Sequence, residues 1–188
     1  MNLSNKVSLK SSSGFSLVEL MVVVAIIGIL AAMSVGQVQK QIAKARQAEA
    51  KTNISSLYTS AKSFFAEYQM YATSFNVIGA GFEGNLRYNT GFSNAVAPAI
   101  PPYTGAPANG IIDTIAFCPV IVAPATVVSC VMVSSNGVPA PALPGTVPAS
   151  TPTTFFGGAS AFIYAAGTLD TWVITDTKAI TNPDVGIP

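Results

Sequence analysis

The sequence predicts an α+β protein in which one long N-terminal helix carries a β-rich domain. The apolar half of this helix is expected to protrude, and its amphipathic half is expected to pack on an antiparallel β-sheet. Three observations support the prediction. Residues 20–39 contain no charged side chain, no proline occurs before Pro98, and short β-rich runs alternate with glycine- and proline-rich stretches after residue 73.

The uncharged stretch predicts a helix long enough to cross a membrane. At ~1.5 Å per residue it spans about 30 Å, the thickness of the hydrocarbon layer of a bilayer. We therefore expect a leader at 1–14, a transmembrane and polymerisation half of the helix at 15–39, an amphipathic half at 40–72 and a globular β-rich head domain at 73–188.

The amphipathic half of the helix is predicted to continue to about Tyr71. Its apolar side chains recur at intervals of three and four residues, while polar side chains occupy the other side. Such a stripe is typical of packing against a core. Its members are Ile54, Leu57, Ala61, Phe64, Tyr68 and Tyr71, with Tyr58 and Phe65 widening it.

The head domain is predicted to contain several short strands. The pattern indicates a strand at 86–92, a hairpin formed by 111–122 and 127–134, and a final pair of strands at 159–167 and 171–177. The stretches 73–84, 95–110 and 138–153 are rich in loop-forming residues and are predicted to connect these elements.

The two cysteines, Cys118 and Cys130, are too few for a zinc site. Beyond a membrane helix, such a pair predicts one disulfide in an oxidising compartment, and two buried free thiols are the alternative. In the predicted hairpin the two residues fall within one position of being opposite each other, so a cross-strand disulfide fits.

The composition argues against catalysis and nucleic-acid binding. Nine basic and eight acidic residues give almost no net charge, and no patch of basic and aromatic residues indicates a nucleic-acid partner. The chain contains no histidine, and the acids after residue 83 show no catalytic spacing. We expect no enzymatic activity, no catalytic residue, no cofactor and no metal site.

The start of the apolar run allows three interpretations. It is a secretory signal cleaved near Ala32-Met33-Ser34, a plain membrane anchor, or a signal that is cleaved in front of the apolar run. The third is favoured by the sequence GFSLVEL after a short basic leader. This combination of Gly14, Phe15 and Glu19 strongly resembles the type IV pilin family.

The resemblance implies a pilin fold and a structural function. The precursor would be stored in the inner membrane among lipid, cleaved after Gly14 by a prepilin peptidase and N-methylated on Phe15. With the inner-membrane pilus assembly machinery it would then form a homopolymer, a cell-surface pilus (fimbrium) with roles in adhesion or motility.

Glu19 is the candidate assembly residue. A free ammonium on Phe15 lies unfavourably at the positive end of the helix dipole, and Glu19 is placed four residues away to neutralise it in its own chain or in a neighbour. An unpaired carboxylate among apolar helices is costly, so pairing favours one register. The alternative is a capping box formed by Ser16 and Glu19.

Gly28 and Gly36 are candidate sites of helix flexibility. Each weakens the helix by roughly 1 kcal/mol relative to alanine. Many type IV pilins have a proline where Gly36 stands, and their helix loosens between that position and that of Gly28. This sequence lacks the proline, so local melting and helix packing on Gly28 are both open.

Two other functions compete with the pilus subunit. The first is a pseudopilin of a type II secretion system, whose major members bind calcium near the tail. Asp113, Asp170, Asp176 and Asp184 are the acids available for this, although solvated loop carboxylates are the simpler interpretation. The second is a secreted or anchored binding domain.

Overall fold

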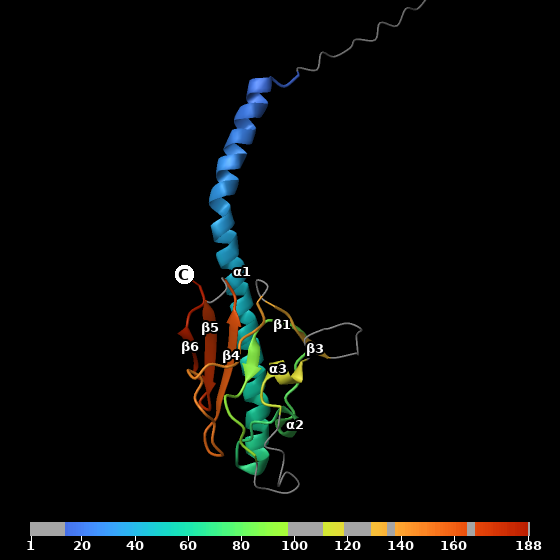
Figure 1. The fold of residues 1–188 in the computed structure, drawn as a ribbon, viewed down its shortest axis with the longest axis vertical. Helices are drawn as coiled ribbons and strands as arrows, with labels where there is room; N and C mark the ends of the chain where they lie inside the picture. The colour runs from blue at the N-terminus through green and yellow to red at the C-terminus, as the bar shows by residue number, and fades with distance from the viewer. Residues whose placement is uncertain (1–13, 98–110, 119–128, 135–137, 165–167, 188) are drawn as a thin grey trace, which may run out of the picture. The chain divides into compact units, whose positions relative to one another are not determined.

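The computed structural model describes residues 14–97, 111–118, 129–134, 138–164 and 168–187. The predicted α+β class is confirmed, because a long apolar helix precedes an antiparallel sheet (Figure 1). Contacts within the chain divide it into two compact units, Met1–Val38 and Gln39–Pro188. Helix α1 runs through both.

Helix α1 (Leu17–Tyr68) is 52 residues long. In the second unit its buried face consists of Ala43, Ala50, Ile54, Leu57, Ala61 and Phe64, which agrees with the predicted stripe. The helix ends three residues before the predicted Tyr71. Gln69 adopts a left-handed φ of 57°, and the N–H of Tyr71 donates to the carbonyl oxygen of Pro152 rather than to a helical partner.

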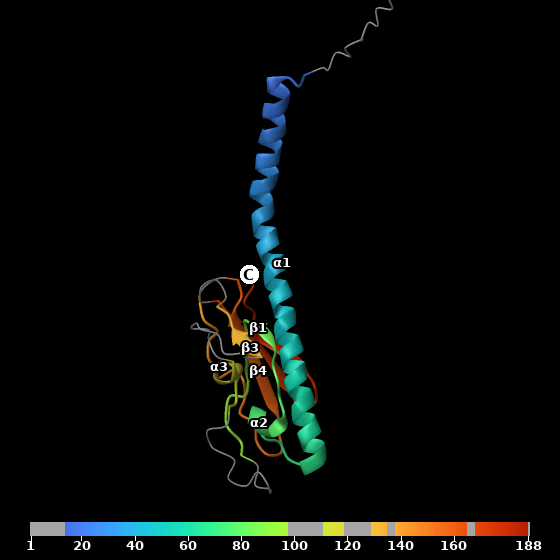
Figure 2. The ribbon, with the colours of Figure 1, turned by 90° about the vertical axis from the view of Figure 1, so that its right-hand side faces the viewer.

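A four-stranded antiparallel sheet has the order β2-β4-β5-β6. Its strands are β2 (Asn89–Gly91), β4 (Phe156–Phe162), β5 (Leu169–Thr175) and β6 (Ile180–Asp184). Strands β4 and β5 confirm the predicted final pair with shifted ends, while β6 lies in the tail, where no strand was predicted. The sheet lies along the second half of α1 (Figures 1 and 2).

A smaller sheet pairs β1 (Gly84–Leu86) with β3 (Cys130–Met132) in parallel. The predicted hairpin of 111–122 with 127–134 is therefore wrong. Residues Thr114–Phe117 form a short helix, α3, because the Asp113 carboxylate caps it by accepting from the N–H of Ala116 at 3.0 Å. Strand β3 pairs with β1 instead. Residues 119–128 lie outside the described part of the chain.

The predicted strand at 86–92 is also corrected. It is divided between β1 and β2, which belong to different sheets. The cause lies between them, where the Glu49 carboxylate accepts from the N–H of Arg87 at 2.6 Å and of Tyr88 at 3.2 Å. These amides bond to the helix rather than to a neighbouring strand.

The predicted disulfide between Cys118 and Cys130 is present, with 5.2 Å between the two Cα atoms. It joins the end of α3 to the start of β3 rather than two strands of a hairpin. Closing a loop of this length stabilises the fold by about 3 kcal/mol in the chain-entropy description.

The predicted loops contain more structure than expected. The stretch 73–84 includes a short helix, α2 (Phe75–Ile78). The stretch 138–153 is irregular, as predicted, but it buries Val147 and Ser150 instead of lying wholly on the surface. Most of the predicted loop at 95–110 falls outside the described residues.

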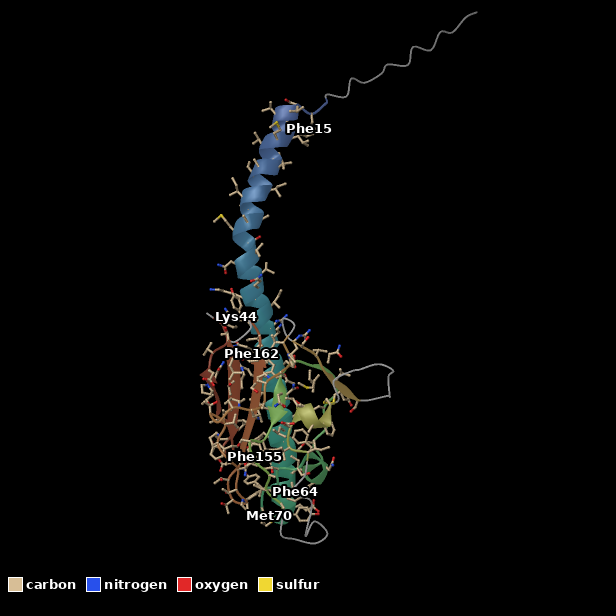
Figure 3. The ribbon with its side chains drawn as sticks, in the orientation of Figure 1. Phe15, Lys44, Phe64, Met70, Phe155 and Phe162 are labelled. Carbon is tan, nitrogen blue, oxygen red and sulfur yellow. A yellow bond between two sulfur atoms is a disulfide. The ribbon has the colours of Figure 1, made fainter. Side chains whose placement is uncertain are left out.

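Aromatic rings fill the core between α1 and the sheets. The ring of Phe155 contacts those of Tyr58, Tyr71 and Phe92 at centroid distances of 5.6–6.0 Å. Phe92 in turn contacts Phe75. Figure 3 shows Phe155 and Phe64 in this part of the second unit. Rings of this size supply much of the buried apolar area of a small domain.

The carboxylate of Asp170, at the centre of the second unit, is fully buried. Its Oδ2 accepts from the Tyr88 hydroxyl at 2.5 Å and from Trp172 Nε1 at 2.7 Å. Its Oδ1 accepts from the side-chain amides of Gln47 at 2.8 Å and Asn182 at 3.2 Å, and from the N–H of Gly186 at 2.9 Å. One side chain therefore connects α1, the β1–β2 link, β5, β6 and the tail.

Tyr88 is the hydroxyl partner in this cluster. Burial first, and the hydrogen bond to Asp170 second, raise the pKa of Tyr88 far above its ordinary value near 10. Both effects favour the neutral phenol, because ionisation would place a second negative charge beside the carboxylate in a dry site.

We predict that Asp170→Asn destabilises the chain by about 2–4 kcal/mol, because an amide nitrogen would face buried donors that now bond to the carboxylate. Asp176→Asn is the matched control, since no hydrogen bond to its carboxylate is found within the described residues; it should cost less than about 1 kcal/mol. Denaturant unfolding of the detergent-solubilised chain measures both. Equal stabilities would contradict the central role of Asp170.

We also predict that stability falls as the pH rises above about 10. The unfolded chain then releases the Tyr88 proton while the folded chain retains it, so the stabilisation is complete below that pH and is lost above it. Ultraviolet titration should show one tyrosine that ionises only as far-ultraviolet circular dichroism reports unfolding. Tyr88→Phe should remove that delayed step, and its persistence in this variant would assign it to another residue.

Candidate functional site

The candidate site begins at the three residues that precede α1 in the described part of the chain. Gly14, Phe15 and Ser16 have no regular secondary structure, and the ring of Phe15 is largely exposed (Figure 3). The first helical hydrogen bond here joins the N–H of Leu20 to the carbonyl oxygen of Ser16 at 3.2 Å. An exposed peptide without regular secondary structure in front of a helix is accessible to a protease.

Glu19 lies in the first turn of α1 and is exposed. No hydrogen bond or ion pair joins its carboxylate to any described residue, and the predicted capping interaction with Ser16 is not among the contacts of residues 14–97. A carboxylate in the first turn is favoured by the helix dipole. Its oxygens also remain open to a donor from another chain.

The rest of the first unit is an uninterrupted apolar surface. Every residue from 17 to 38 is exposed in the single chain, including the large apolar side chains of Met21, Ile26 and Leu30. Within the described residues, α1 is the one helix long and apolar enough to cross a membrane. An apolar surface of this extent is found in proteins only where lipid or another protein covers it.

Gly28 and Gly36 both lie inside α1, which is continuous through them. A Cβ atom added at either position would meet no other atom within 4 Å in the single chain. The two glycines therefore have no packing role within one molecule.

The four acids after residue 83 are held in different places. Asp170 is buried among five donors, Asp113 caps α3, and Asp184 accepts from the Thr146 hydroxyl at 3.2 Å. Asp176 faces the ammonium of Lys62. Among the described residues, no three acids, cysteines or histidines gather as metal ligands would.

Sequence reasoning missed the importance of Asp170. The one available signal was an acid between the apolar residues Leu169 and Trp172, directly in front of the predicted strand at 171–177. Its donors come from positions 47, 88, 172, 182 and 186, so no local spacing could have indicated the cluster.

The chain matches one family model and several curated proteins. A family model described as the prokaryotic N-terminal methylation motif matches residues 9–35. The type IV major pilin protein PilA of Myxococcus xanthus (strain DK1622) is 52% identical over 75 residues, which make up 40% of this chain and 34% of the relative. A fimbrial protein of Pseudomonas aeruginosa is 34% identical over 87 residues, 46% of this chain and 53% of the relative.

In its N-terminal methylation motif and in these relatives, the chain resembles the type IV pilin family. The methylation motif includes Gly14, Phe15 and Glu19, and the apolar surface of α1 starts inside it. The matched regions span about a third and about half of the length of these two relatives, so what the relatives do as whole proteins is taken up only as a proposal.

Proposed function

We propose that this chain is the structural subunit of a type IV pilus. The precursor is held in the inner membrane by residues 15–39, cleaved after Gly14 by a prepilin peptidase and N-methylated on Phe15. The assembly machinery then polymerises it into a surface filament that serves adhesion or motility. The observation that carries the proposal is the fully exposed apolar surface of α1 in residues 17–38.

This surface explains why storage and assembly use the same helix. In the membrane it is covered by lipid, and in a filament it is covered by the same helix of other copies. The exchange is nearly neutral in hydrophobic free energy because lipid tails are as apolar as leucine. Packing and polar pairing must therefore supply the direction of assembly.

Glu19 supplies that polar pairing. After cleavage, the ammonium of Phe15 in a neighbouring copy is a cation that can neutralise the carboxylate among apolar helices. The exposed position of Glu19, without a partner among residues 14–97, supports this role. The free-energy cost of burying the Glu19 carboxylate and the Phe15 ammonium is removed only in the register that places the two groups side by side.

We predict that mass spectrometry of the exported chain finds Phe15 as its first residue, carrying one added methyl group. Cleavage in front of the apolar run is the feature that separates a pilin from a secreted domain. A first residue near Ser34 would contradict the proposal directly, because the apolar helix would then be discarded.

We further predict that Glu19→Ala is processed normally and stays in the membrane, yet lowers surface filaments at least tenfold, which corresponds to about 1.4 kcal/mol per subunit. Immunoblots of sheared filaments and of membranes measure both pools. Ser16→Ala is the control: it removes the capping partner and keeps the carboxylate, so it should assemble normally. Loss of filaments in both variants would favour capping over pairing.

A further inference from the structure

The second unit carries its lysines along one side, which we call the basic edge. Lys40, Lys44, Lys51 and Lys62 of α1 are separated by four, seven and eleven residues, each close to a whole number of turns of a 3.6-residue helix. They therefore form a line along α1. Lys178, in the turn between β5 and β6, is the fifth member.

Contacts place this edge on the side of β5 and β6. Lys51 Nζ lies 4.6 Å from the ring centre of Trp172 in β5. Lys62 Nζ lies 5.8 Å, and Lys178 Nζ 5.9 Å, from the ring centre of Tyr58. Figure 3 shows Lys44 on the same side of α1 as β5. Asp176 and Asp184 also lie here, so five lysines stand against two acids.

The opposite side of the second unit carries an acidic edge, made by Glu49, Glu67, Glu83 and Asp113. Glu67 follows Glu49 by eighteen residues, which is five full turns of α1. The carboxylate of Glu49 bonds to the backbone of the β1–β2 link, Glu83 directly precedes β1, and Asp113 caps α3. Arg87, 3.9 Å from Glu49, and Arg46, which lines the same surface pocket as Glu49 and Arg87, are the basic residues described on this edge, so four acids stand against two arginines.

Figure 1 shows β1 and α3 on one side of α1 and β5 and β6 on the other. Charges of opposite sign are therefore separated across the second unit, although its total charge is close to zero. Several of these groups have no partner inside the unit: Lys44, Glu67 and Glu83 are exposed and make no hydrogen bond or ion pair with any described residue.

We propose that the basic edge of one copy binds the acidic edge of the next copy when the chain assembles. The inference rests on the proposed function, because it names the contact between head domains. Two different surfaces that complement each other form a heterologous interface, which continues into an open helical polymer rather than closing as a dimer. The charge complementarity of the two edges identifies a second copy as the occupant.

Such a contact defines the orientation and register of neighbouring copies, which the apolar helix does not define by itself. Apolar packing of α1 is nearly uniform along its length, whereas opposite charges fix orientation and penalise wrong registers. At physiological salt the screening length is about 8 Å, so the pairs act only between touching head domains.

The test is a charge swap in the full-length chain, expressed in cells that assemble it. Lys44→Glu, Glu67→Lys and Glu83→Lys each place like charges across the interface and should lower sheared filaments about tenfold. Lys44→Glu combined with Glu67→Lys, or with Glu83→Lys, restores opposite signs. At least one of these double variants should recover filaments to within about threefold of the parent.

Lys44→Arg is the control, since it keeps the charge and should assemble at the parent level. Thermal unfolding and the membrane pool of each variant should stay unchanged, because none of these side chains bonds to another described residue. Unchanged filaments in the single variants would overturn the inference, as would loss without recovery in both double variants, the result expected if the basic edge binds a lipid or another polyanion. The Glu19 and Phe15 results are independent of these outcomes, so the two proposals fail separately.

Discussion

The buried carboxylate of Asp170 is the interaction on which the second unit depends. A carboxylate without water must be fully hydrogen-bonded, and here five donors from α1, the β1–β2 link, β5, β6 and the tail meet that requirement. Because these donors are far apart in sequence, the cluster can form only when helix, sheet and tail have reached their final places. The hydrogen bonds of Asp170 are therefore complete only in the fully folded second unit.

The two halves of α1 have different surfaces. Its first half offers apolar side chains on every side, which suits a helix that exchanges lipid for other copies of itself. Its second half buries only one side and leaves the remainder polar and charged. The same helix thus carries the apolar surface of residues 17–38 and several of the lysines and acids of the second unit.

Several elements were predictable because their signals are local. The apolar run, the stripe that begins near Ile54, the final strand pair and the disulfide all follow from composition or periodicity over a few turns. Two of the failures, the predicted hairpin and the predicted strand at 86–92, have a common cause. The Asp113 carboxylate caps a helix, α3, within a run that is rich in β-forming residues. The Glu49 carboxylate accepts hydrogen bonds from the N–H groups of Arg87 and Tyr88, which therefore do not pair with a neighbouring strand. In both places a specific side chain outweighed the preference of the backbone.

The sequence by itself determined the resemblance to type IV pilins and the apolar half of α1, because each is a contiguous pattern whose chemistry does not depend on distant residues. Only the tertiary structure decided the pairing of β1 with β3, the role of Asp170 and the separation of charge into two edges. Those features require residues from distant parts of the chain to meet. The spacing of residues along the sequence does not predict these contacts, because the packed core determines where the helices and strands lie.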